Sequence, residues 1–101
     1  MYSKEKVKMF MQAQFGFVID IDRLAEEAVQ LYLDELDYEL ISPEFVKNLP
    51  DPVIFQTYLY TDETEWIIGI ALEAETNNPL FLVCLKDGVR VYEKLLSEGE
   101  F

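Results

Sequence analysis

The stretch VIFQTYLYTDETEWIIGIALEAETNNPLFLVCLKDGVRVY, residues 53–92, decides the fold of this chain. It contains four apolar runs of strand length, separated by short polar segments, and these runs cover residues 53–60, 66–75, 80–86 and 89–92. The last separator, Asp87-Gly88, is typical of a type I′ hairpin turn. Because such short loops join neighbouring antiparallel strands, we predict an antiparallel meander of four strands.

Two helices are predicted ahead of this stretch. Residues 3–15 have apolar side chains at a spacing of three to four, with Ser3 as N-cap and Gly16 at the end. A second helix is expected at about residues 22–38, capped by Asp20 or Asp22. Its predicted buried face consists of Leu24, Ala25, Ala28, Leu31, Tyr32 and Leu36.

The expected fold class is α+β. Two N-terminal helices would pack on a four-stranded antiparallel β-meander in two layers, in the order α-α-β-β-β-β. At 101 residues, the chain is expected to form a single domain, 1–101. Two helices can cover only one face of this apolar sheet. The second face therefore needs a cover: a helical turn predicted at 43–49, the C-terminal tail, a second copy of the chain, or a partner.

The charge balance is strongly acidic, with 20 acidic and 8 basic side chains and a net charge of −12. Phosphate binding depends on Lys and Arg, so direct binding of nucleic acid is not expected, and a basic protein surface is the natural complement. No apolar run approaches the ~20 residues that span a bilayer, and the start of the chain lacks the continuous apolar core of a signal peptide. We therefore expect a cytoplasmic protein that does not contact membranes.

Several kinds of chemistry are disfavoured by the composition. Without histidine, the chain lacks the commonest general base and zinc ligand, and Cys84 is interpreted as a buried, inert thiol. The Asp20-Ile21-Asp22 segment superficially resembles a phosphatase or two-carboxylate metal motif, but helix capping explains it more simply. The acidic loop 61–65 has no glycine for a calcium-binding bend. We expect a non-enzymatic protein without cofactor or metal.

The distribution of acids suggests a binding surface instead. The outer face of the predicted second helix carries acids that oppose the helix dipole near its C-terminal end, which is a costly arrangement for a merely solvated helix. The loop after the first strand adds three more. The predicted partner-binding residues are Glu26, Glu27, Asp34, Asp37, Asp62, Glu63 and Glu65.

The second half of the chain resembles the SUKH immunity superfamily. The residues that carry the resemblance are a strand led by Trp66 with Gly69, then Asn78-Pro79-Leu80-Phe81-Leu82, then Gly88 before Val91-Tyr92. The resemblance covers under half of the chain and lacks a long closing helix. The distribution of acids favours a toxin-immunity or antitoxin-type inhibitor of a partner with a basic surface, and the resemblance implies an immunity protein as well. Two alternatives stay open: a phage-encoded DNA mimic of the anti-CRISPR or anti-restriction type, and a homodimeric structural or regulatory module that pairs through the second sheet face.

Overall fold

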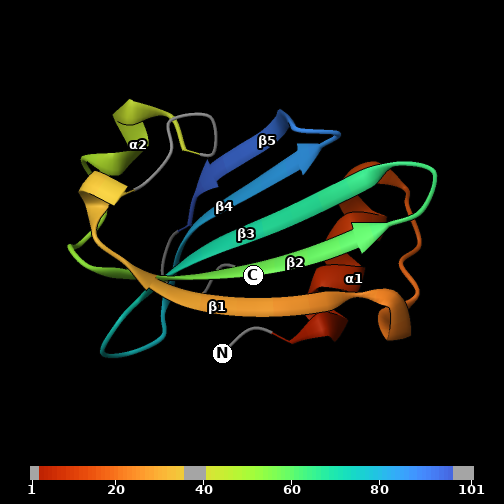
Figure 1. The fold of residues 1–101 in the computed structure, drawn as a ribbon, viewed down its shortest axis with the longest axis horizontal. Coiled ribbons are helices and arrows are strands. Elements are labelled where there is room, and N and C mark those ends of the chain that lie inside the picture. The colour runs from red at the N-terminus through yellow and green to blue at the C-terminus, as the bar shows by residue number, and fades with distance from the viewer. Residues whose placement is uncertain (1–2, 36–40, 97–101) are drawn as a thin grey trace.

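A computed structural model describes residues 3–35 and 41–96, and it shows one five-stranded antiparallel sheet with a helix against one face (Figure 1). The strands lie in the sheet in the order in which they follow along the chain. The elements are α1 (Lys4–Phe15), the 3₁₀ turn η1 (Ile21–Arg23), β1 (Ala25–Leu31), the 3₁₀ turn η2 (Leu33–Glu35), α2 (Pro43–Val46), β2 (Val53–Thr61), β3 (Glu65–Glu73), β4 (Pro79–Lys86) and β5 (Val89–Leu95).

The predicted fold class is wrong in one respect: the described part of residues 22–38 is not a helix. It forms most of η1, then β1 and η2. Among the residues that the structure describes, the sheet therefore has five strands, and α1 is the one long helix. Alanine, glutamate and glutamine favour a helix locally, but pairing with β2 overrides this preference. All seven residues of β1 pair antiparallel with β2, from Ala25 opposite Leu59 to Leu31 opposite Val53.

The other predicted elements are confirmed within a few residues. Helix α1 begins after Ser3, whose hydroxyl accepts a hydrogen bond from the Lys6 amide, and ends at Gly16 in the left-handed conformation (φ 67°). The four predicted strands are β2 to β5. Asp87 and Gly88 both have positive φ, as a type I′ turn requires. Local capping and turn chemistry therefore identified these elements correctly.

The face of the sheet that α1 covers, here called the α1 face, is a closed core. Val7 and Met11 of α1 are fully buried against strand residues that include Tyr58, Trp66 and Ile68. The link after the helix completes the layer, since Phe17 lies edge-on to the Tyr60 ring at 5.6 Å and stacks at a tilt on Trp66. The helix and the link together remove this face from water.

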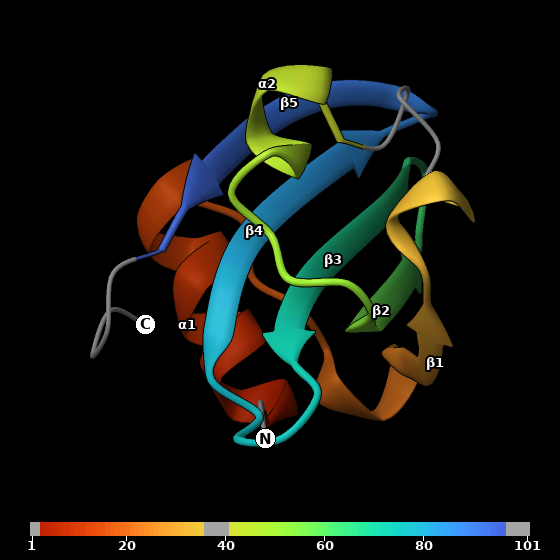
Figure 2. The ribbon, with the colours of Figure 1, turned by 90° about the vertical axis from the view of Figure 1, so that its left-hand side faces the viewer.

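The opposite face, here called the α2 face, is covered only in part. The predicted turn after Ser42 is present as α2, and Phe45 packs on Phe81 with ring centroids 5.3 Å apart. Helices α1 and α2 lie at opposite corners of the sheet (Figures 1 and 2). Beyond α2, one row of side chains across β2, β3 and β4 stays partly exposed, and we call it the open half: Leu59, Ile67 and Leu85.

Candidate functional site

Strand β1 is the feature that gathers the acids, and it forms one edge of the sheet (Figure 1). It is hydrogen-bonded to β2 on one side only, and residues 25–30 are all exposed. Its seven residues extend over about 20 Å at the rise of a β-strand. The turn η1 lies at its start and η2 at its end, so the chain from 20 to 35 runs along this edge.

Exposed acids lie toward both ends of this edge, and the residues from 28 to 33 between them are uncharged. Together with the β2–β3 loop beside η1, these acids form the surface that we call the acidic edge: Asp20, Asp22, Glu26, Glu27, Asp34, Glu35, Asp62, Glu63 and Glu65. The segments 20–35 and 61–65 contain a single base, Arg23. The acidic edge therefore has most of its negative charge at the start of β1 and a smaller group at its end, with one internal counterion.

The structure changes how the predicted partner-binding residues are arranged. Glu26 and Glu27 were expected on one helical face, but they are neighbours on a strand and point to opposite faces of the sheet. Asp34 lies in η2, at the far end of β1. Asp62 and Glu63 of the β2–β3 loop, and Glu65 at the start of β3, lie toward the start of β1. Asp37 lies outside the described residues. Six predicted residues thus follow the acidic edge as a line instead of forming a compact patch.

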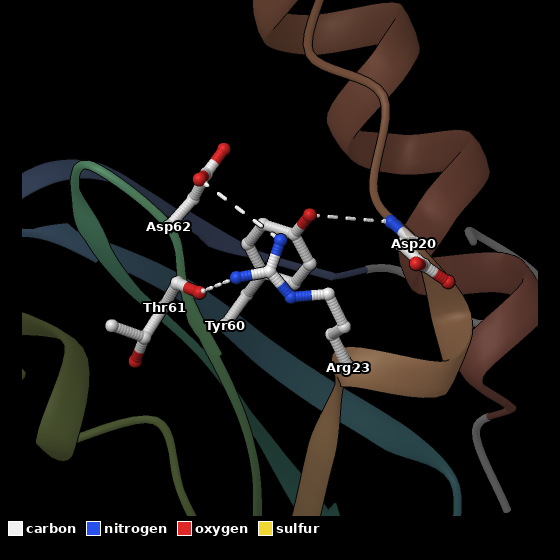
Figure 3. A network of polar contacts seen from close by, with 5 residues as sticks. All are labelled: Asp20, Arg23, Tyr60, Thr61 and Asp62. Carbon is white, nitrogen blue, oxygen red and sulfur yellow. Dashed lines mark hydrogen bonds and ion pairs between the residues drawn. The ribbon is translucent and has the colours of Figure 1, made fainter.

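At the start of β1, Arg23 of η1 contacts the β2–β3 loop (Figure 3). Its Nη2 donates a hydrogen bond of 2.8 Å to the Thr61 carbonyl, and its Nη1 lies 4.0 Å from Asp62 Oδ1. The guanidinium also lies over the Tyr60 ring, 5.5 Å from its centre. Since both partners of the ion pair are half exposed, its electrostatic contribution is about 0–1 kcal/mol. We interpret Arg23 as the residue that holds η1 against the β2–β3 loop.

The Asp20-Ile21-Asp22 segment has a capping role. Asp20 Oδ1 accepts a hydrogen bond of 3.1 Å from the Asp22 amide, and the Asp20 amide donates one of 3.5 Å to the Tyr60 hydroxyl. Capping was predicted, but it serves a 3₁₀ turn and not a long helix. Among residues 3–35 and 41–96, no three carboxylate or thiol side chains gather as metal ligands would.

The α1 face buries one thiol and one side-chain amide, those of Cys84 and Gln56. Cys84 is fully buried, as predicted, and burial raises the pKa of its thiol to about 12, so it stays protonated and unreactive at neutral pH. Gln56 is also fully buried, and its side-chain amide has no hydrogen-bond partner in the described structure. Neither group faces an opening through which a substrate would arrive.

The outer side of α1 carries a shallow depression of about 400 Å³, lined by Lys6, Met9, Phe10 and Ala13. It is open to solvent and almost entirely apolar, so it offers no arrangement of groups for catalysis. Within the described ranges, no helix combines the length and the apolar composition that crossing a membrane demands.

Sequence reasoning missed that Glu26 and Glu27 lie on an edge strand and that the other acids flank it. A signal for the strand is present: Val29, Leu31 and Leu33 recur at a spacing of two, and Leu31 and Leu33 pack in the cluster on the α2 face. The contact of Arg23 with Tyr60 and Thr61 left no sequence signal, because it joins residues nearly forty positions apart.

No known family, curated protein or solved structure matches this chain. The resemblance of the second half to the SUKH superfamily therefore stays a hypothesis from the sequence, and the function has to be argued from the acidic edge.

Proposed function

We propose that this chain is a small, non-enzymatic, acidic protein-binding module that inhibits or regulates a partner with a basic surface, in the manner of a toxin-immunity protein. The single observation that carries the proposal is the acidic edge, where nine exposed acids accompany one base. That base already contacts Asp62 and the β2–β3 loop, so most of the negative charge is left for a partner.

The charge of the acidic edge favours a contact surface over a merely solvated one. An excess of like charge along one edge disfavours the compact fold through self-repulsion, whereas mixing the two signs would not. Facing a basic surface, the same charges accelerate association and improve the choice of partner, and salt weakens both effects. An inhibitor that has to capture its target rapidly would use such a surface.

The test is affinity capture of partners from a lysate of the source organism at low and at high salt. We compare the unmodified chain with a triple variant, Glu26→Gln, Glu27→Gln and Glu63→Gln. A matched control removes three charges elsewhere, through Glu5→Gln, Glu44→Gln and Glu75→Gln. Both variants have the same net charge, so any difference between them reports where the charge lies.

We expect a basic protein that is retained at low salt, released at high salt, lost by the triple variant and kept by the control. A captured toxin would identify an immunity-type inhibitor, and a captured nucleic-acid-binding defence protein would identify a DNA mimic. If the triple variant and the control retain the same proteins equally well, the acidic edge is only a solvated surface and the proposal is wrong.

The open half favours a second candidate, a homodimeric structural or regulatory module. Leu59 is 40% exposed, and Ile67 and Leu85 beside it are only half-buried. A second copy packed there would bury these apolar side chains, at the cost of bringing together two chains that each carry a charge of −12. Light scattering at low and high salt tests this candidate, which predicts a dimer that salt stabilises.

A further inference from the structure

Within residues 3–35 and 41–96, no strand pairs with the backbone groups on the outer side of β1. The Thr57 hydroxyl donates a hydrogen bond of 3.4 Å to the Glu27 carbonyl, which shows that this carbonyl points toward β2. Backbone groups alternate in direction along an antiparallel strand. The amides and carbonyls of Glu26, Ala28 and Gln30 therefore point away from the sheet. These groups form a regular row that another strand could pair with.

The opposite edge of the sheet, β5, lacks this regularity. Its pairing with β4 shifts between Cys84 and Leu85, and such a bulge twists an edge out of shape for pairing. The Ser42 hydroxyl also donates a hydrogen bond of 2.7 Å to the Glu93 carboxylate, which ties the start of α2 to β5. In contrast, β1 pairs with β2 in an uninterrupted register over seven residues. Of the two edges, β1 is the one suited to receive a strand.

The side chains of β1 indicate the chemistry of that strand. Glu26 and Glu27 point to opposite faces, so a paired strand would need basic side chains on both faces at this position. Two consecutive basic residues satisfy this requirement. Val29, 46% exposed, lies next along the edge and favours an apolar or β-branched neighbour. A second copy of β1 is disfavoured, because pairing two such edges would bring their glutamates close together.

We infer that β1 is the docking edge for an extended basic segment of the partner protein, which adds to the sheet as a sixth strand next to β1. The inference rests on the proposed function and gives its mode of binding. Main-chain hydrogen bonds would fix the register of the added strand, and its consecutive basic residues would contact Glu26 and Glu27. Acids at both ends of β1 would extend the attraction beyond the paired residues.

The first test uses a synthetic probe and the isotope-labelled full chain. The probe is a short capped peptide with adjacent lysine and arginine flanked by valine and threonine. Its counterpart has the same sequence and charge but carries N-methyl groups on alternate amides, which removes the donors that would face β1. We expect the first peptide to bind at low salt and to slow hydrogen exchange at the amides of Ala28 and Gln30. The N-methylated peptide should bind about a hundredfold more weakly, because it loses about three hydrogen bonds of about 1 kcal/mol each.

The second test changes the edge itself. Ala28→Pro removes one outward amide and leaves the charge unchanged, and proline is tolerated on edge strands where the amide faces solvent. The matched control is Ala28→Thr, which keeps the amide. We expect the proline variant to lose affinity for the parent peptide and the threonine variant to keep it. If proline unfolds β1, which hydrogen exchange of the Val29 amide would show, the comparison of the two peptides still decides the question.

The outcomes separate this inference from the proposed function. Equal affinity of the two peptides, or the absence of binding by either, overturns the docking edge. The acidic surface would still stand if the triple charge variant loses the captured partner while the control keeps it. If that variant loses nothing, the proposed function itself fails. A dimer of the 11.8-kDa chain that Ala28→Pro abolishes would overturn the inference in favour of pairing between two copies.

Discussion

The two faces of the sheet are built from similar apolar residues, yet they are covered to different extents. Ile67 and Ile68 illustrate the difference, because they are neighbours on β3 and point to opposite sides. Ile68 is fully buried under α1, whereas Ile67 lies half-buried in the open half. The strands alone therefore do not determine which face is core. The preceding segments decide it: α1 and its link cover one face, and α2 covers part of the other.

Because the two faces are covered to different extents, a binding surface costs less folding stability on the exposed parts of the sheet than on the α1 face. The α1 face contains a large buried aromatic and aliphatic cluster, so a substitution there would act on folding first. The open half and the acidic edge contribute little buried area, so their residues are free to be chosen for a partner. Substitutions should therefore cost most on the α1 face and least in the open half.

Ile68→Ala should destabilise the protein by about 2–5 kcal/mol. Ile68 is fully buried and lies between Tyr58 on β2 and Cys84 on β4, so truncation leaves a cavity that these neighbours cannot fill. Equilibrium unfolding in urea measures the loss as a lower midpoint at an unchanged slope. A cost below about 1 kcal/mol would mean that the α1 face is not a closed core.

Gly69→Ala should cost about 1–3 kcal/mol through overpacking on the α2 face. A β-carbon at this position would lie 2.7 Å from Cε1 of Phe55 and 3.1 Å from Cγ1 of Val83. The matched background is Phe55→Leu, whose shorter side chain removes the nearest contact. In a double-mutant cycle, Gly69→Ala should cost less in that background. Strictly additive costs would contradict the explanation by contact with the Phe55 ring.

The same division explains how much of the fold could be predicted from the sequence. Helix α1 and strands β2 to β5 were predicted because their caps, turns and apolar runs are local. Strand β1 was not, because none of residues 25–30 is buried and the apolar alternation is weak. It exists through pairs such as Val29 with Phe55, which join distant parts of the chain. Composition identified the acids as a group, but their arrangement along an edge depends on that long-range pairing.

Ile67→Ala should have the smallest effect, a loss of less than about 1 kcal/mol, because its side chain is already partly hydrated in the folded monomer. The measurement is the same urea unfolding, repeated at low and high protein concentration. If a second copy covers the open half, the unfolding midpoint of the unmodified chain will rise with concentration. Ile67→Ala would then remove that rise and cost as much as Ile68→Ala at the higher concentration. A small cost that does not depend on concentration would instead leave the open half as surface in the free protein and would exclude the dimer through this face.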